Sequence, residues 1–505
     1  MLKRITQSSS ICLTILLVAG TGVTTVNAAQ TTQATFTSRS SRRGEDLSTP
    51  KSFEPQPAAI TLSLSDQDGP TGVGHRYSAP PGLPPNDAAT GVIDRMPDRA
   101  LEQVTVDGLL SIALQRNPTL RQSQAHITAE TGRAIQAGLY PNPVIRYSAE
   151  QIGVGGTAGE FHGGIISQEI VRGGKLQLSR AKYAQRIRVA EALALAQQFR
   201  VTNDVQAHFY HALALQRRVA LRQELLKSAE DHALSTREAY NMGQANVADI
   251  RRANVRLQSS RLDLLAEQNQ LNQRTRQLSA LAGLELSPQM LAGELDGEPV
   301  PLDYQQILES LFQLSPELIA ARAKAQSDRI TVERELVEPV PNLNVEGGAG
   351  YNYEADQTVA TAGVSIRLPL YDRNQGTIQQ ARADLARQWA EIERIEFRLQ
   401  QDLATQFQNY VTASQHVDQY RTLILPEYKE AYRLTLESYR ENRINWSEVL
   451  QSQQDYYMAR MDYADWLARW RESEVMIDGM LLHGGLNAAP GVPPAGHIDA
   501  IAKPR

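Results

Sequence analysis

Three patterns in the sequence resemble chemical sites, but each lacks a part that the chemistry needs. His208 and His211 are three residues apart on a predicted helix and could share a metal ion, yet no acid or third histidine is spaced to complete the ligand set. The segment 153–158 (GVGGTA) matches a relaxed dinucleotide-binding fingerprint, but no buried strand precedes it and a strand follows it. Gly173-Gly174-Lys175 lacks the upstream glycine and the following Ser or Thr of a phosphate-binding loop. We therefore interpret the histidines as an exposed or interhelical pair and both glycine-rich segments as turns.

Composition argues against an enzyme and against a nucleic-acid-binding protein. No serine or cysteine lies in a nucleophile motif, and the only cysteine is Cys12, near the N-terminus. The net charge is −5 over 505 residues, and no block of basic residues stands out. We expect no catalytic residues, no cofactor, no metal site and no nucleic-acid partner.

Residues 1–28 are predicted to be a secretory signal peptide. Lys3 and Arg4 precede an apolar run from Ile11 to Ala19, and Val26-Asn27-Ala28 provides small residues for cleavage. The apolar run is too short to span a bilayer, and no later segment has the apolar length of a membrane helix. Because Cys12 lies inside the signal, the mature chain would contain neither disulfides nor thiolate metal sites.

The N-terminus of the mature chain is expected to carry no lipid and to be disordered. Thr21 occupies the position where a lipoprotein would have its cysteine. Residues 29–100 are rich in Ser, Thr, Pro and Gly and show no periodicity, which indicates a disordered linker. Residues 483–505 are expected to form a similar tail.

Two long helices are predicted between Gly173 and Leu284, since this stretch contains no proline and very few glycines. Apolar residues recur there in alternating steps of three and four, the heptad pattern of a coiled coil. The pattern runs through Ile187, Ala190, Ala194, Val201, Val205, Ala212, Leu215, Val219, Leu226, Ala229 and Ala233, then Ile250, Leu257, Leu264, Leu271 and Leu278. Helices of roughly 35 to 65 residues would be about 50 to 100 Å long, which suits a rod or the wall of a tube.

The same unit occurs twice in the chain. The segment 110–120 (LSIALQRNPTL) matches 308–318 (LESLFQLSPEL), and the hairpin turn after Tyr240 is repeated after Tyr439, at an offset of about 198 to 200 residues. We therefore divide the ordered chain into a first repeat at 101–285, an inter-repeat segment at 286–306 and a second repeat at 307–482. Each repeat is expected to contain a short helix, two strands and a long helical hairpin.

The predicted strands alternate apolar and polar residues in a way that suits a membrane barrel with a wet lumen. After Pro341, Leu343, Val345 and Tyr351 alternate with polar residues, and Ala360 to Leu368 repeats the pattern. A half-buried soluble sheet alternates in the same way. The secretory signal and the tyrosines near the strand ends favour the barrel.

The number of strands then predicts how many chains assemble. One chain supplies four strands, and a lone sheet in lipid would leave its edge groups unpaired. Two chains would make eight strands with a filled interior, whereas three make twelve strands and leave a pore. Three chains would also bring twelve long helices into one ring that continues the pore.

These features resemble those of the TolC-type outer-membrane factors, the exit ducts of bacterial tripartite efflux pumps and type I secretion systems. The resemblance covers roughly Leu101 to Leu482 and depends on an ordered set of motifs rather than on any single one. The set comprises the Pro-x-Pro at 141–143 and 339–341, Gly173-Gly174-Lys175, Leu368-Pro369-Leu370-Tyr371-Asp372, and the tips Tyr240-Asn-Met-Gly243 and Tyr439-Arg-Glu-Asn442.

The resemblance implies a mainly α protein with membrane β-strands, a homotrimer with a twelve-stranded barrel in the outer membrane of a Gram-negative-type bacterium. A twelve-helix barrel would cross the periplasm, and residues 286–306 would belong to the equatorial belt around it. The helix tips would meet a periplasmic membrane-fusion adaptor, which is joined to an inner-membrane pump of the RND or ABC type. The metal and drug efflux ducts of this family resemble the chain about equally well, so heavy-metal cations, drugs and secreted proteins all stay open as cargo.

The resemblance also assigns residues to a periplasmic gate at the tips. By position, Asp249 falls on the tip aspartate of the first hairpin, and Tyr439 and Glu448 fall on the gate tyrosine and gate acid of the second. Three copies of one carboxylate on an axis would form a constriction that attracts cations. The clamping arginine of the family is replaced by Ile444, with Arg443 beside it, and the second acidic position is Gln451. A solvated helix face is the alternative for each acid.

The remaining tip residues are expected to contact the adaptor. They are Tyr240, Gly243, Asn246, Asn442 and Asn445. Two other classes of protein are considered. A secreted coiled-coil adhesin would explain the heptads but not the repeated strand pairs, and a periplasmic adaptor would carry one hairpin between lipoyl-like half-motifs, which the sequence lacks.

Overall fold

The computed structural model describes residues 103–153 and 159–488. The chain divides into two units, Met1–Val92 and Ile93–Arg505, and all described residues belong to the second. The predicted signal peptide at 1–28, the linker at 29–100 and most of the predicted tail at 483–505 lie outside the described residues. Residues 483–488, the start of that tail, are described and lie against the first long helix, where the backbone N–H of Gly485 donates to Asp204 over 2.7 Å.

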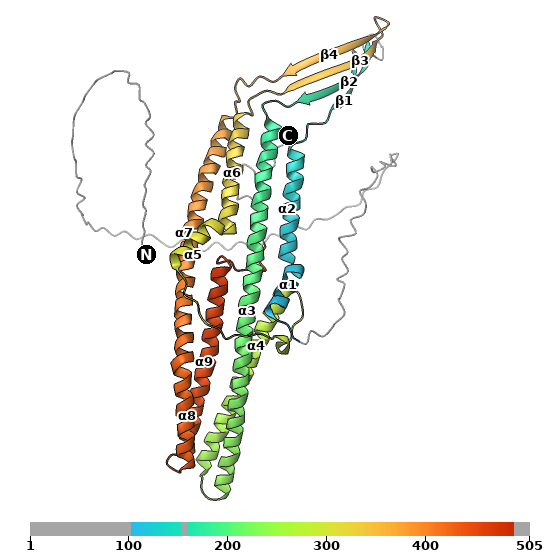
Figure 1. Cartoon of the computed structure of the whole chain (residues 1–505). Helices are drawn as coiled ribbons and strands as arrows, with labels where there is room; N and C mark the ends of the chain where they lie inside the picture. Colours follow the sequence, from blue (N-terminus) through green and yellow to red (C-terminus); the bar gives the residue numbers. More distant parts are fainter. Residues whose placement is uncertain (1–102, 154–158, 489–505) are drawn as a thin grey trace, which may run out of the picture. The chain divides into compact units, whose positions relative to one another are not determined.

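The elements occur in the same order twice, as the sequence predicts (Figure 1). The first series is α1 (Val106–Arg116), α2 (Pro118–Ala137), β1 (Val144–Glu150), β2 (Phe161–Ile170), α3 (Lys175–Asn241) and α4 (Val247–Ala282). The second is α5 (Tyr304–Leu314), α6 (Pro316–Leu336), β3 (Leu343–Asn352), β4 (Gln357–Ile366), α7 (Gln375–Gln419), α8 (Leu425–Arg440) and α9 (Trp446–Asp478). A short 3₁₀ turn, η2 (Pro288–Met290), lies between the two series.

Each series begins with two helices, where the sequence analysis expected one. Asn117 and Ser315 have extended backbones with ψ of 124° and 120°, and a proline follows each as the first residue of the next helix. A residue before proline is pushed out of the helical region, and proline itself is well suited to a helix start. The repeated Asn-Pro and Ser-Pro steps therefore divide what the pattern suggested was one helix.

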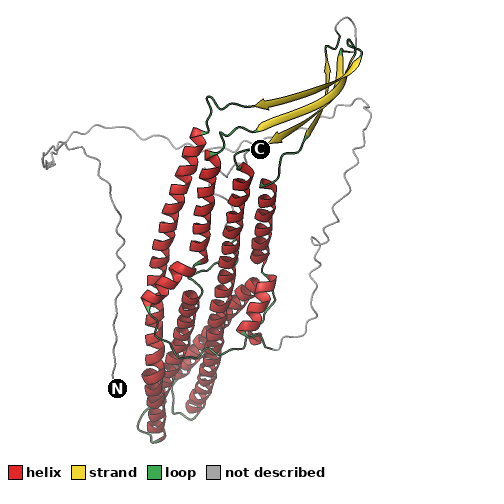
Figure 2. Ribbon diagram, turned by 45° about the horizontal axis from the view of Figure 1, so that its top comes forward, coloured by secondary structure: helices red, strands yellow, loops and turns green. Residues whose placement is uncertain are grey.

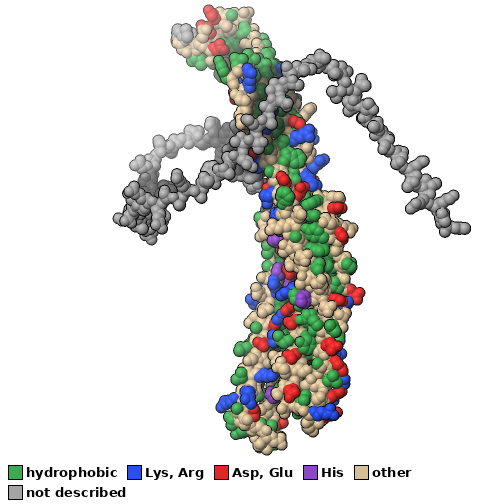
Figure 3. All heavy atoms as spheres, turned by 90° about the vertical axis from the view of Figure 1, so that its left-hand side faces the viewer, with side chains coloured by type: hydrophobic (Ala, Val, Ile, Leu, Met, Phe, Trp, Pro, Cys, Tyr) green, Lys and Arg blue, Asp and Glu red, His purple; other side chains and the backbone are tan. Residues whose placement is uncertain are grey.

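The helices form an extended layer from which the sheet projects at one end (Figure 2). Nearer the sheet, α3 packs between α2 and α6, and α6 packs on α7. Farther from the sheet, α3 packs on α4 and α9, and α9 packs on α7 and α8. Charged side chains of both signs are interspersed along the helices (Figure 3). Among the described residues, none of the helices combines the length and the apolar composition needed to cross a bilayer.

The predicted heptad seam is confirmed over the middle of the hairpin. Val201, Val205 and Ala212 are fully buried in one cluster, and Leu278 of α4 joins them. Towards the tip the seam is less covered, since Ile250 and Leu257 are only half-buried. The packing that holds the hairpin together is therefore concentrated where the short helices and the inter-repeat segment surround it.

The second long helix is interrupted, whereas α3 continues for 67 residues without a break. Tyr420–Ile424 forms a π-helix between α7 and α8, and Pro426 follows it. Proline has no N–H to donate to the hydrogen bond that a helix interior requires. A proline is therefore a common cause of a local change in the hydrogen-bonding pattern of a helix. The first hairpin is thus built from α3 and α4, whereas the second is built from α7, α8 and α9 because its first arm is interrupted.

The strands form one antiparallel sheet in the order β1-β2-β3-β4. The middle pair joins the two repeats, with Phe161 opposite Asn352 and Ile170 opposite Leu343. Both β1 and β4 pair on one side only, so each leaves an edge.

Asn203 connects the end of α9 to α3. Its side chain is buried, and its Nδ2 donates to the carbonyl oxygens of Gly479 and Leu482 over 2.8 and 2.7 Å. The amide therefore satisfies two backbone acceptors where the chain leaves the second hairpin.

We expect Asn203→Ala to lower the free energy of unfolding by about 1–3 kcal/mol, because buried carbonyl groups would lose their donor. Thermal unfolding of the detergent-solubilised protein measures the change. Gln198→Ala, at an exposed position on the same helix, is the control and is expected to leave the melting temperature nearly unchanged. Equal melting temperatures for the two variants would contradict the assignment.

Candidate functional site

The sheet has one apolar and one polar face, defined by the strand register. The apolar face carries Ile145 and Tyr147 of β1, Ile166 and Ile170 of β2, Leu343 and Val345 of β3, and Val364 and Ile366 of β4. The polar face carries Arg146, Ser148, Glu169, Asn344, Glu346 and Ser365, among others. Ile145 is 78% exposed and Val364 is 70% exposed, so the apolar face is uncovered in the single chain. An uncovered apolar face of this kind marks a surface for lipid or for another protein.

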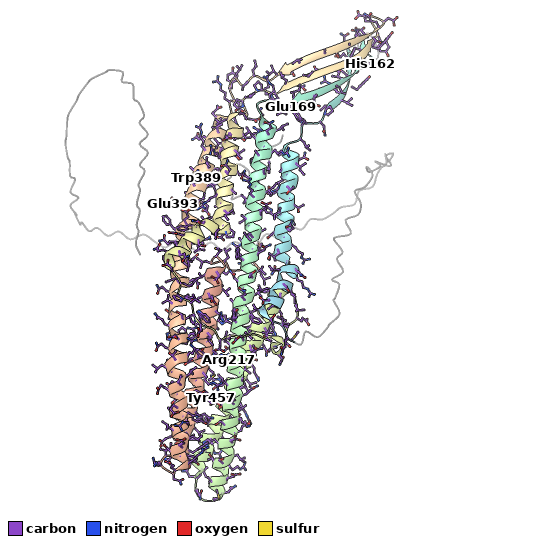
Figure 4. All side chains as sticks on the ribbon, viewed as in Figure 1. His162, Glu169, Arg217, Trp389, Glu393 and Tyr457 are labelled. Atoms are coloured by element: carbon purple, nitrogen blue, oxygen red, sulfur yellow. The ribbon has the colours of Figure 1, made fainter. Side chains whose placement is uncertain are left out.

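Aromatic residues collect at the end of the apolar face far from the helices. The Tyr147 hydroxyl bonds to the ring of His162, the His162 ring lies edge-on to Tyr353 at 5.6 Å, and Tyr351 and Tyr353 are 4.9 Å apart. Figure 4 places His162 at this end of the sheet and Glu169 at the end near the helices. At the helical end, Tyr140 and Tyr371 are 64% and 92% exposed. Aromatic residues at both ends of an apolar band are typical of proteins that meet a membrane interface.

The two hairpin tips have the same backbone geometry. Gly243 and Asn442 adopt positive φ angles of 75° and 59° just after their helices end. The next residue in each turn donates its N–H back to the helix, from Gln244 to Ala239 over 2.8 Å and from Arg443 to Ser438 over 2.9 Å. Glycine and asparagine are the residues that accept such a left-handed conformation most readily. The predicted tip repeat is therefore present in three dimensions.

Asp249 is used locally in the first tip. The side chain of Asn246 accepts from the Asp249 N–H over 3.0 Å, and the Asp249 carboxylate accepts from the Asn246 N–H over 2.9 Å, which is a capping box. Arg252 forms an ion pair with the same carboxylate. The Asn246 N–H, followed by Arg252, holds the pKa of Asp249 below its ordinary value. The carboxylate therefore stays charged, but its hydrogen-bonding capacity is directed into its own helix.

The second tip leaves its acid exposed. Asn445 precedes α9 without a side-chain capping bond, and Glu448 is exposed in its first turn. Tyr439 packs on Trp446, with ring centres 4.9 Å apart, and Arg443 pairs with Glu441 over 3.0 Å. Of the predicted gate acids, Glu448 is thus the one whose side chain extends into solvent rather than into a local cap.

The hairpins contact each other farther from the tip, through residues that the sequence analysis did not single out. Arg256 of α4 donates to Gln454 of α9 over 2.8 Å, and Ser228 of α3 donates to Gln453 over 2.6 Å. Among the described residues, no hydrogen bond or ion pair joins Asp249 to Tyr439. Gln451, at the second acidic position, bonds to Asp455 of its own helix.

Charged residues also occupy seam positions of the first hairpin. Arg222 on α3 and Glu267 on α4 continue the three-and-four spacing, and so do His208 and Arg274. Glu267 is 3% exposed, accepts hydrogen bonds from Arg218 and forms a longer ion pair with Arg222 over 3.8 Å, while Arg218 reaches across to Asp465 of α9. The signal that could have identified this network was the presence of charges at heptad positions that normally carry apolar residues.

His208 and His211 form interhelical contacts, as one of the two interpretations of the pair predicted. His211 Nε2 lies 2.9 Å from Glu472 on α9, and His208 Nδ1 lies 3.3 Å from Arg274 on α4. Burial and then Arg274 lower the pKa of His208, and the bond to His211 lowers the pKa of Glu472. Within residues 103–153 and 159–488, no group of three or more His, Asp or Glu side chains is arranged to hold a metal ion.

Known proteins share both the sequence pattern and the fold. The family model described as outer membrane efflux protein matches residues 109–284 and 307–481. The cobalt-zinc-cadmium resistance protein CzcC of Cupriavidus metallidurans is 26% identical over 407 residues, which cover 78% of this chain and 94% of CzcC. The proteases secretion protein PrtF of Dickeya chrysanthemi is 22% identical over 313 residues, which cover 58% of this chain and 67% of PrtF.

Solved structures share the arrangement of helices and strands. The MtrE outer membrane channel of Neisseria gonorrhoeae superposes with a TM-score of 0.61 at 19% identity, covering 76% of this chain and 90% of MtrE. This likeness shows the fold, and the family model spans both repeats. The chain therefore belongs to the outer membrane efflux protein family, the TolC-type channels that the sequence motifs suggested.

Proposed function

We propose that the protein is a passive, non-enzymatic exit duct, a homotrimer that crosses the outer membrane and extends through the periplasm. The observation that carries this proposal is the sheet, whose apolar face is uncovered and whose two edge strands lack partners. In lipid, unpaired edge groups cost several kcal/mol each, so β4 of one copy must pair with β1 of the next. Three copies close a twelve-stranded barrel with the polar face inside.

The helical layer supports the same closure. In the part of the layer nearer the sheet, and among the described residues, α2 packs mainly on α3 and α7 packs mainly on α6, so these two helices are its outer members. Trp389 and Phe397 of α7 are 58% and 63% exposed, and Ile135 of α2 is 62% exposed. Figure 4 places Trp389 and Glu393 on α7 at the edge of the layer. A ring of three copies would bring each α7 against the next α2 and cover these side chains, a heterologous contact that closes by rotation.

This arrangement also suggests a role for each remaining segment of the chain. Residues 1–28 would direct export and be removed, leaving an unlipidated chain, and 29–100 would be a linker. Residues 101–285 and 307–482 would be the two repeats, with 286–306 as the equatorial belt and 483–505 as a tail. Asp296 supports the belt, since it pairs with Arg217 of α3 over 2.6 Å. Figure 4 shows Arg217 at mid-length of α3.

The tips would form the periplasmic gate and the docking surface for the adaptor. The adaptor would in turn connect the duct to an RND or ABC pump in the inner membrane. Glu448 would form the acidic ring, with Asp249, Tyr439 and Arg443 nearby. Tyr240, Gly243, Asn246, Asn442 and Asn445 would contact the adaptor. Because Asp249 is held in its capping box, we assign it the role of fixing the first tip rather than of lining the opening.

For the cargo we propose divalent metal cations. CzcC is named for resistance to cobalt, zinc and cadmium and matches this chain over 94% of its own length, whereas PrtF is named for protease secretion and matches over less. An acidic ring at the gate would favour cations.

The function is tested by deleting the gene and measuring growth in cobalt, zinc and cadmium salts together with protease secretion. Metal sensitivity that the intact gene restores supports cation export, while a secretion defect without metal sensitivity supports the protein-export role instead. Extraction from outer membranes as a trimer that resists SDS, with channel activity in planar bilayers, tests the duct itself. A water-soluble protein that never enters lipid would return the coiled-coil adhesin and the periplasmic adaptor to consideration.

We expect Glu448→Gln to lower the preference for cations over anions in single-channel recordings, because three carboxylates would lose their charge at one constriction. The control is Glu441→Gln, which removes another exposed tip carboxylate, one that is paired with Arg443. Its effect on selectivity is expected to be small. Unchanged selectivity in Glu448→Gln would remove this residue from the gate.

A further inference from the structure

Two large apolar side chains of β2, Ile165 and Phe161, lie on the polar face of the sheet, and the neighbours of Phe161 in its own row are polar. Phe161 stands opposite Glu150 on one side and Asn352 on the other, at the end of the strands far from the helices. Its side chain is nevertheless only 9% exposed, compared with 78% for Ile145 on the opposite face. An aromatic ring on a wet surface is hidden only when something in the surface accommodates it.

Two glycines provide that space. A Cβ placed on Gly163 would lie 2.5 Å from Phe161 Cζ, and a Cβ placed on Gly350 would lie 2.4 Å from the same atom. Gly163 and Gly350 face each other across β2 and β3 in the row next to Phe161. The ring therefore lies flat over the backbone of both glycines, towards the helical end of the sheet, rather than upright on the wall.

The backbone itself does not require glycine at these positions. Neither residue has the positive φ that favours glycine, whereas Gly153 and Gly159 in the preceding turn have φ of 88° and 125°. On the apolar face, a Cβ on Gly164 would meet nothing within 4 Å. Gly163 and Gly350 are thus required because a larger residue would not fit beside the Phe161 ring and the neighbouring carbonyl groups.

We propose that Phe161 sets the width of the pore at its outer mouth, and that Gly163 and Gly350 form a recess that keeps its ring against the wall. This inference rests on the proposed function, since the polar face must be the lumen. Three rings held flat leave the mouth clear for solute. Three rings displaced from the recess would stand into the lumen, because a side chain on the polar face has no other direction to move.

Labelling of a single cysteine from outside the cell tests the proposal. The only native cysteine, Cys12, lies in the predicted signal peptide, so Ser365→Cys places one thiol on the polar face near the helical end of β4. A maleimide added to intact cells must pass the row of Phe161 to reach it. We expect Gly350→Ala to slow labelling by a bulky polyethylene-glycol maleimide several-fold and to leave labelling by a small maleimide nearly unchanged.

Gly348→Ala is the matched control. It lies on the same strand and face, and its Cβ would approach the Gly164 carbonyl to 2.5 Å, as the Cβ of Gly350 would approach the His162 carbonyl to 2.5 Å. The side chain that this Cβ would displace is Ile165, whose Cγ1 would lie 2.9 Å away, and Phe161 is not among the three nearest atoms. Ile165 has no aromatic ring and lies nearer the helical end of the strand than Phe161, so its displacement tests the loss of space on this face without moving the ring. We expect Gly348→Ala to leave labelling by the bulky maleimide unchanged. We expect the same of the double variant Phe161→Ala with Gly350→Ala, because it has no ring to displace.

The outcomes separate the inference from the proposed function. If Ser365→Cys is not labelled by the small maleimide in intact cells, or Val364→Cys is labelled equally, the polar face is not a lumen and the proposed function fails. If Ser365→Cys is labelled but Gly350→Ala slows the bulky reagent no more than Gly348→Ala, the recess proposal is wrong. Should Gly350→Ala fail to assemble, Phe161→Trp is the second variant, and it is expected to slow the bulky reagent as well.

Discussion

Replacing Val364 by arginine is expected to abolish assembly of the protein in the outer membrane. Val364 lies on the apolar face, two residues before the end of β4, and is 70% exposed, so in the proposed barrel it would face lipid. An arginine on the lipid face costs up to about 2–4 kcal/mol, depending on its depth, and a trimer carries three copies of that cost. We expect the SDS-resistant trimer to disappear from outer-membrane fractions and unfolded monomer to replace it.

Ser365→Arg is the matched control, since it introduces the same charge one residue along the same strand but on the polar face. A lumen residue is in contact with water, so the trimer is expected to form normally and only the conductance to change. If both variants assembled equally well, the apolar face would not be in contact with lipid. If both failed, the polar face would be a packed surface rather than the wall of a pore.

Replacing Arg218 by alanine is expected to have the second largest effect, on stability rather than on insertion. Arg218 bridges Glu267 of the first hairpin, through Nε over 3.1 Å, and Asp465 of the second. Glu267 is 3% exposed, and after the substitution only the Arg222 Nε, 3.8 Å away, would remain as a charged partner. Removing one member of a buried ionic group costs about 3–5 kcal/mol, because the other charge is left without compensation.

Thermal and denaturant unfolding of the purified trimer measure this loss. The control is Arg261→Ala, since Arg261 pairs with Glu230 on the surface of the same hairpin, over 3.2 Å and with both side chains 48% exposed. Such surface pairs contribute about 0–1 kcal/mol. A loss in Arg218→Ala no larger than that in Arg261→Ala would show that the network does not connect the hairpins energetically.

Regular elements were predictable because their signals are local. The absence of glycine and proline, the three-and-four spacing through Val201, Val205 and Ala212, and the alternation after Pro341 each report on a few neighbouring residues. The internal repeat then fixed the order of elements. The break at Asn117-Pro118 is visible in the same way, because a residue before proline is disfavoured in a helix, and it marks a helix boundary as well as a repeated motif.

The pairing of charged residues could not be predicted in this way. Glu267 and Arg274 occupy heptad positions, but which residue each contacts depends on how α3, α4 and α9 are rotated against one another. Similarly, Asp249 and Glu448 occupy equivalent positions in the two repeats, yet one completes a capping box and the other does not.

The sequence by itself determined the secondary structure, the duplication and the family of this protein, because these depend on periodicity along the chain. Only the tertiary structure decided where Arg218 directs its charge and how Phe161 is accommodated by Gly163 and Gly350. The contacts of Arg218 with Asp465 and of Phe161 with Gly350 join residues far apart in the sequence, and their energies depend on distance and burial, which no local pattern encodes.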